Sequence, residues 1–145
     1  MLVVDTGPIV AAAVTSEIDH HACVELFTGL HLAQRRLMLP TTVLSEVGHL
    51  LGRDLGPRGE ARFLRAISEG EFELVDIEPV DIDRMAELVE QYADSGLDTT
   101  DASVIAVAER LGISEVATLN RRDFAFVRPR HVSALTLLPE RLASL

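Results

Sequence analysis

The sequence predicts an α/β fold in which a mainly parallel central sheet is covered by helices on both faces. Short apolar runs of strand length alternate along the chain with longer segments of helical periodicity. Strands that are separated by helices pair in parallel, and such sheets are buried on both faces. The 145 residues, 48% of them hydrophobic, suffice for a real core and argue against disorder. We therefore expect residues 1–145 to form a single domain.

The first part of the chain is expected to form a strand, two helices and a second strand. Residues 2–4 are an apolar run typical of a buried strand, and Pro8 suits the start of the helix that follows. Residues 16–19 resemble a capping box, which predicts a helix from there to about residue 32. The apolar residues 37–39 predict a strand that the next proline ends.

Two helices separated by a break come next. Residues 42–51 form the first, capped by its leading threonine. The dipeptide Gly56-Pro57 interrupts the pattern, and residues 58–68 resume it. Residues 72–77 alternate between apolar and polar side chains, which predicts a strand.

The last part of the chain repeats the alternation of helices and strands. Residues 80–92 carry apolar side chains at helical spacing, and residues 98–111 form an alanine-rich helix that Gly112 ends. The apolar runs 116–119 and 135–138 are predicted strands.

Cysteine content and hydropathy indicate where the protein works. Cys23 is the only cysteine, which excludes an internal disulfide and agrees with a reducing cytoplasm. The longest uncharged apolar stretch, residues 8–14, is too short to span a bilayer and has no preceding basic residue, unlike a signal peptide. We therefore expect a cytoplasmic protein without a membrane segment.

The formal net charge of −10 argues against nucleic-acid binding, because phosphate backbones attract cations. Two details weaken this argument. All 13 basic residues are arginine, which reflects either a GC-rich genome or the superiority of arginine as a bidentate phosphate ligand. The second detail is a basic strip between Asn120 and His131 that contains one acid, Asp123. Its arginines are Arg121, Arg122, Arg128 and Arg130.

Acidic side chains occupy positions that the predicted fold brings together. Asp5 directly follows the first strand, Glu46 lies within a helix, Asp101 begins another helix, and Asn120 follows a later strand. Sites in parallel sheets form beyond the carboxyl ends of the strands. Oxygen ligands that converge there suit a hard cation such as Mg²⁺, whose other positions remain for water and a phosphate.

Asp5 and Glu46 each have a structural alternative to metal binding. Asp5 could simply cap the helix that follows it. Glu46 shares a helical face with Val43 and Leu50, where a carboxylate rarely points without a partner. It could instead reach solvent at the edge of the helix, but the cost of burial favours a ligand.

Asp98 and Asp101 lie three residues apart at the start of one helix and could form a capping pair. Asp101 also aligns with Ile105 and Ala108 on the inward face of that helix. We therefore assign the cap to Asp98 and metal binding to Asp101.

The acids lie within four motifs, which in order are Asp5-Thr-Gly-Pro, Leu44-Ser-Glu-Val, Asp101-Ala-Ser-Val-Ile-Ala-Val-Ala and Ala117-Thr-Leu-Asn-Arg-Arg-Asp-Phe. Together they resemble the motifs of PIN-domain ribonucleases, and most of all those of VapC-type toxins of bacterial toxin–antitoxin pairs. The resemblance covers residues 2–138, nearly the whole chain. It implies a three-layer α/β/α sandwich, a homodimer, a cognate antitoxin, and RNA cleavage that depends on Mg²⁺ or Mn²⁺. Carried over by position, Asp5, Glu46 and Asp101 match the acidic triad of the family.

The chain departs from the family at Asn120, where many relatives carry a fourth aspartate. An amide offers a carbonyl oxygen but no charge, which weakens a second metal site most. Asp123 lies three residues on and could compensate. Thr6 and Thr118 flank the acids and either orient them or cap helices.

Two rival functions follow from other features. With Asn120 in place of an acid, the domain could be a catalytically weak or inactive PIN-like module that binds RNA or protein. Separately, Glu17 and His20, and likewise Glu46 and His49, have the Glu-x-x-His spacing of four-helix di-iron proteins. The predicted strands oppose such a bundle.

Overall fold

Five parallel strands form the centre of the protein. In the computed structural model, which describes residues 1–143, the order across the sheet is β3-β2-β1-β4-β5. The strands are β1 (Leu2–Val4), β2 (Leu37–Pro40), β3 (Glu73–Val75), β4 (Glu115–Ala117) and β5 (Thr136–Leu138). Every pairing is parallel, and β1, which is wholly buried, lies in the middle. The register pairs Val4 with Ala117, so that β1 and β4 end side by side.

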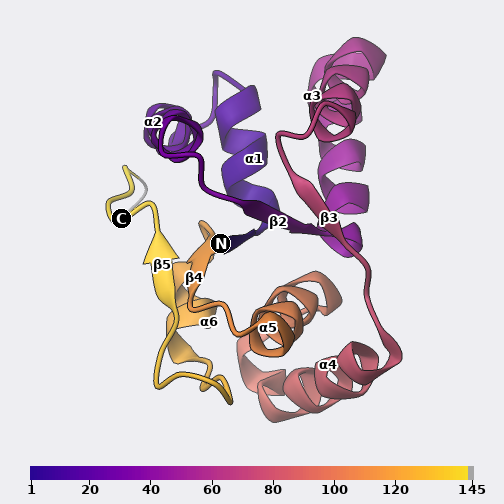
Figure 1. Ribbon diagram of the computed structural model, residues 1–145, viewed down its shortest axis with the longest axis vertical. Helices are drawn as coiled ribbons and strands as arrows, with labels where there is room; N and C mark the ends of the chain where they lie inside the picture. Colours follow the sequence, from indigo (N-terminus) through magenta and orange to yellow (C-terminus); the bar gives the residue numbers. More distant parts are fainter. Residues whose placement is uncertain (144–145) are drawn as a thin grey trace.

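Helices cover both faces of this sheet. In Figure 1, α1, α2 and α3 lie on one side of the strands and α4 and α5 on the other. The helices are α1 (Thr6–Ala13), α2 (His20–Leu32), α3 (Thr41–Ser68), α4 (Pro79–Gln91), α5 (Thr99–Leu111) and α6 (Arg121–Phe126), with a short 3-10 turn, η1 (Ala93–Ser95). The predicted α/β/α sandwich with a parallel sheet is therefore confirmed. In the described part of the chain, none of these helices combines the length and apolar character of a membrane span.

The element boundaries differ from the predicted ones at several places. The predicted capping box at residues 16–19 does not open α2, which begins at His20 with Asp19 at its N-cap position. Instead, the amide of Glu17 donates to the carbonyl of Val14 and that of His20 to the carbonyl of Glu17, which makes two successive tight turns. Strand β3 is shorter than predicted, because as an edge strand it pairs with β2 alone.

The predicted break at Gly56 is confirmed as a sharp bend inside α3. Gly56 has φ 74° and ψ −175°, a conformation that is essentially restricted to glycine. The segment after the bend turns back on the first half of the helix. This brings the carboxylate of Glu60 close to Gly48 and Gly52. An added Cβ at Gly52 would meet Glu60 Oε1 at 2.7 Å, so a larger residue there would require the flexible Glu60 side chain to move.

Replacement of Gly56 tests the backbone strain directly. No atom lies within 4 Å of an added Cβ at this position, so Gly56→Ala should destabilise through φ alone, by about 1–3 kcal/mol. Gly29→Ala is the matched control, because Gly29 lies inside α2 with equally open surroundings and no positive φ. The control should be neutral or up to about 1 kcal/mol more stable. Urea unfolding measures both, and equal effects would contradict the strained bend.

Candidate active site

Asp5 lies at the carboxyl end of β1, at the N-cap position of α1. Its amide donates to the carbonyl of Ala117 at 2.9 Å, which extends the pairing of β1 with β4. The side chain is 5% exposed and makes no capping hydrogen bond to α1. Instead, Thr118 Oγ1 donates to Asp5 Oδ2 at 2.8 Å. Helix capping therefore does not explain this carboxylate.

Thr118 connects Asp5 to the start of α6. The Thr118 side chain is fully buried, and its hydroxyl accepts a hydrogen bond from the amide of Asn120 at 3.0 Å while it donates to Asp5. Asn120 sits at the N-cap position of α6, and its Nδ2 donates to Asp123 Oδ2 at 3.1 Å. The fourth motif thus reaches Asp5 through a threonine hydroxyl rather than through a carboxylate.

Asp98 and Asp101 form a reciprocal capping box at the start of α5. The amide of Asp101 donates to Asp98 Oδ1 at 2.8 Å, and the amide of Asp98 approaches Asp101 Oδ2 at 3.4 Å. Asp98 is exposed at the N-cap position, whereas Asp101 is half-buried one turn inside the helix. Asp98 is therefore the capping residue of α5, as predicted.

Glu46 approaches the same region from α3. It is half-buried, and its charge contributes to the raised pKa of Asp5. Thr42, one turn before Glu46, does not cap α3 as predicted, because the helix begins at Thr41 with Pro40 as its N-cap. The hydroxyls of Thr42 and Ser103 lie 2.6 Å apart, and Ser103 Oγ donates to the carbonyl of Thr100 at 2.6 Å, so Thr42 is the donor to Ser103.

The Thr42–Ser103 hydrogen bond connects the first turn of α3 to the second turn of α5, and sequence reasoning missed it. Ser103 is fully buried in a run of alanine and valine. A hydroxyl inside an apolar helical segment needs a hydrogen-bond partner, which was the one available signal. The bond sets the spacing between the elements that carry Glu46 and Asp101.

The electrostatics of these carboxylates show uncompensated negative charge. Burial raises the pKa of Asp5 from 3.8 to about 6, with smaller contributions from the charges of Glu46 and Asp98. Burial also raises the pKa of Asp101 from 3.8 to about 7, followed by the charges of Asp5 and Asp98. Within residues 1–143, no arginine or histidine forms an ion pair with any of these acids.

The oxygen atoms of these side chains suit a hard cation that is bound by only a few protein ligands. Thr6 Oγ1 is buried beside Asp5 without a hydrogen-bond partner. Among residues 1–143, no three acidic, histidine or cysteine side chains are already spaced as ligands of one ion. Mg²⁺ is commonly held by one or two carboxylates, with water and phosphate in its other positions. Asp5 and Asp101 supply such a pair.

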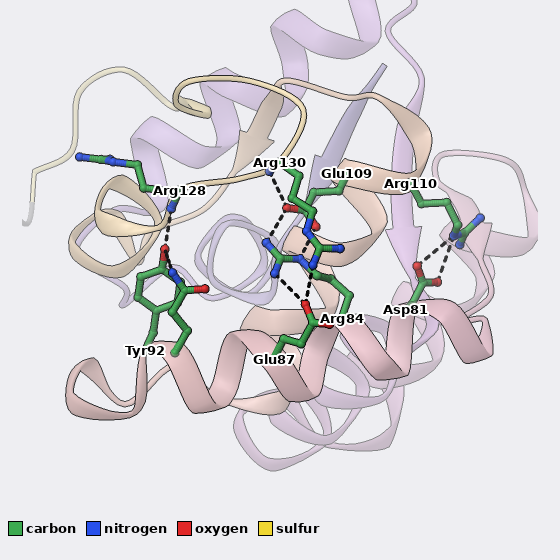
Figure 2. Close-up of polar contacts among 9 residues, drawn as sticks. Asp81, Arg84, Glu87, Tyr92, Glu109, Arg110, Arg128 and Arg130 are labelled. Carbon is green, nitrogen blue, oxygen red and sulfur yellow. Dashed lines mark hydrogen bonds and ion pairs between the residues drawn. The ribbon is translucent and has the colours of Figure 1, made fainter.

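The predicted basic strip is only partly available for an anion. Arg130 Nη2 pairs with Glu87 at 2.6 Å, and the amide of Arg130 donates to Glu109 Oε2 at 2.8 Å. Figure 2 shows this network, in which Arg84 lies between Glu87 and Glu109. Arg130 therefore connects the segment after α6 to α4 by an ion pair and to α5 by a hydrogen bond.

The other arginines of the strip have no acidic partner in the described chain. Arg122 and Arg128 are exposed. Arg121 is half-buried, and its Nε and Nη2 atoms are buried without a hydrogen-bond partner. Three cations thus remain near the start and end of α6.

The arrangement of elements and acids agrees with a family comparison. Residues 2–129 match the model of the PIN domain. The chain belongs to the PIN domain family. Ribonuclease VapC26 of Mycobacterium tuberculosis is 27% identical over 138 residues, which are 95% of this chain and all of that relative.

Solved structures of low sequence identity share the fold. The crystal structure of Mycobacterium tuberculosis VapC20, a sarcin–ricin loop cleaving toxin, is similar with a TM-score of 0.73 and 19% identity, over 85% of this chain and 92% of that one. A toxin–antitoxin complex from Klebsiella pneumoniae has a TM-score of 0.65 and 20% identity, over 88% and 92%.

The raised pKa values make the stability of the metal-free PIN domain depend on pH. Between pH 3.8 and about 7, the folded state holds protons on Asp5 and Asp101 that the unfolded chain has released. Their contribution to stability is therefore largest below pH 4 and falls as the pH rises to about 7. Asp5→Asn should remove much of this loss and gain on the order of 2 kcal/mol at pH 7.5 in EDTA.

Denaturant unfolding at several pH values, compared between wild type and variant, measures this difference. Identical pH profiles for the two proteins would show that Asp5 is not held in an unfavourable ionised state.

Proposed function

We propose that this protein is a metal-dependent endoribonuclease and acts as the toxin of a toxin–antitoxin pair. The observation that carries the proposal is the buried Asp5 carboxylate, oriented by Thr118 and close to Asp101 and Glu46, without a basic partner in residues 1–143. Membership of the PIN family and the relative named Ribonuclease VapC26, matched over its full length, support the same reaction. RNA and a cognate antitoxin would both be met in the cytoplasm.

Asp5 and Asp101 are the residues that would hold Mg²⁺ or Mn²⁺. When bound, such an ion neutralises charge on the phosphate and lowers the pKa of water. The Thr118 hydroxyl keeps Asp5 Oδ2 in one orientation, and the capping box keeps Asp101 in the first turn of α5. That turn also presents the positive end of a helix dipole, which favours a phosphate.

Glu46 completes the set from α3. It would either ligate the ion or accept a hydrogen bond from the attacking water. Both roles require Glu46 to lie near Asp5, and its charge does contribute to the raised pKa of Asp5. Asp98, Asn120 and Asp123 are weaker candidates. The side chain of Asn120 donates to Asp123, and an amide contributes no charge to a second ion. The arrangement therefore favours one well-held ion.

Variants of the two acids in the capping box separate catalysis from helix capping. Asp101→Asn should abolish RNA cleavage and leave the fold intact. Asp98→Asn should keep most of it, because asparagine caps nearly as well as aspartate. Cleavage by the wild type should require Mg²⁺ or Mn²⁺ and stop in EDTA.

Gel analysis of a structured RNA, with melting temperatures of each variant, provides the measurement. Undiminished cleavage in EDTA would remove the metal mechanism. An inactive Asp98→Asn beside an active Asp101→Asn would invert the assignment of the two acids.

The antitoxin is expected to block the acidic site with a cation. Uncompensated carboxylates attract an arginine or lysine side chain, and a free ribonuclease would harm the cell that makes it. Expression of this chain alone should arrest growth, and co-expression of the cognate antitoxin should restore it. Colony counts after induction, with Asp101→Asn as the inactive control, measure both effects. Normal growth despite folded wild-type protein, in the native host without its antitoxin gene, would oppose the toxin function.

A further inference from the structure

Phe126, the last residue of α6, is an aromatic side chain that the fold leaves open to solvent. It is 65% exposed, whereas the other four phenylalanines are buried or half-buried. An exposed apolar residue is common by itself. Phe126 differs because its ring packs against a buried tyrosine, its helix begins beside the acidic site, and arginines without acidic partners lie near it in the chain.

The ring of Phe126 is braced from one side by Tyr92. The two ring centroids are 6.1 Å apart with an interplanar angle of 78°, an edge-to-face contact. Tyr92 is itself 7% exposed, and its hydroxyl accepts a hydrogen bond from the amide of Arg128 at 2.8 Å, as Figure 2 shows. Tyr92 is therefore held by burial and a hydrogen bond, and the ring of Phe126 packs against it on one side.

The short helix α6 and two hydrogen bonds connect Phe126 to Asp5. Helix α6 has six residues and is about 9 Å long, so Phe126 stays close to its N-cap residue, Asn120. Asn120 is bonded to Thr118, which is bonded to Asp5. Asp123, the side-chain partner of Asn120, lies three residues before Phe126 on neighbouring positions of the helix surface.

Two free arginines flank the ring. Arg122 and Phe126 are four residues apart on α6, so their side chains are neighbours on its exposed face. Arg128 Nη1 reaches the carbonyl of Ala125 at 3.5 Å, next to the ring. Neither arginine has an acidic partner within residues 1–143, although six other arginines do. Those six are Arg35, Arg36, Arg53, Arg84, Arg110 and Arg130.

We propose that Phe126 is a positioning residue that stacks on an unpaired base of the RNA, while Arg122 and Arg128 bind the phosphates on either side of that base. The proposal rests on the ribonuclease function proposed above. A fixed aromatic face between cations is the arrangement with which proteins bind single-stranded nucleic acid. In an otherwise acidic chain, it would hold the RNA strand at the far end of the helix whose start is bonded, through Thr118, to Asp5.

Fluorescence provides a direct test, because the chain contains no tryptophan. Phe126→Trp in the cleavage-deficient Asp101→Asn background places a single tryptophan at the stacking position, and excitation at the red edge of its absorption avoids the emission of Tyr92. A short oligoadenylate should quench its emission saturably, whereas duplex RNA should not, because A-form helices keep their bases stacked inside. Leu32→Trp in the same background is the matched control. Leu32 is exposed at the end of α2, toward the amino end of β2, and its replacement should show no saturable quenching.

Kinetics test the positioning role separately. Phe126→Leu should raise KM for a single-stranded RNA about tenfold or more and change kcat much less, because the side chain binds substrate without touching the reacting atoms. Phe126→Tyr should restore KM. Equal melting temperatures of the variants would verify the fold.

The outcomes distinguish this proposal from the ribonuclease function. Cleavage by the wild type together with an unchanged KM in Phe126→Leu and no quenching would overturn the stacking role alone. Quenching of Phe126→Trp by oligoadenylate without any cleavage by the wild type would keep the stacking role and remove the nuclease. If Phe126→Leu weakened the binding of the antitoxin or of a second copy but left RNA affinity unchanged, Phe126 would be a protein contact and the proposal would be wrong.

Discussion

The hydrogen bond from Thr118 to Asp5 is the interaction on which the arrangement of the site depends. It is available because the parallel register brings the ends of β1 and β4 together, so that the residues just beyond them meet. Burial makes ionised Asp5 unfavourable, and this bond is the largest influence that offsets it. The same hydroxyl receives the amide of Asn120 and so fixes where α6 begins. One threonine therefore bonds both the central acid and the start of the helix that carries Arg122.

The sequence was sufficient to predict the layers of the fold and the proximity of acids whose charges interact, such as Asp5 and Asp101. Short apolar runs such as residues 2–4 leave few alternatives once helices separate them, because each must be buried on both faces. The bend at Gly56 was predicted on a different ground, because glycine followed by proline disfavours a continuing helix. Asp98 could be assigned to the cap and Asp101 to the inner face because Asp101 aligns with Ile105 and Ala108 on one side of the helix.

Other features depended on tertiary contacts that local sequence does not encode. The hydroxyl of Thr42 was predicted to cap a helix, but it bonds Ser103, which is distant in sequence. Helix α6 is too short for a recognisable period, and its start depends on Thr118. The basic strip was identified correctly as a run of charges. Arg130, however, forms an ion pair with Glu87, which the fold supplies from α4. Which charges in a run remain free is decided by the neighbours that the fold supplies.

The exclusive use of arginine has a consequence for how the surface charge of this protein can change. Arg36 and Arg84 each contact a carboxylate through two nitrogen atoms, a geometry that a lysine ammonium cannot reproduce. A guanidinium also keeps its proton at every physiological pH, and it is not a substrate for lysine acetylation. The positive charges of these side chains are therefore permanent. A change in pH therefore alters the electrostatic contrast between the acidic site and the arginines around α6 through carboxylates such as Asp5 and Asp101, whose pKa values are raised.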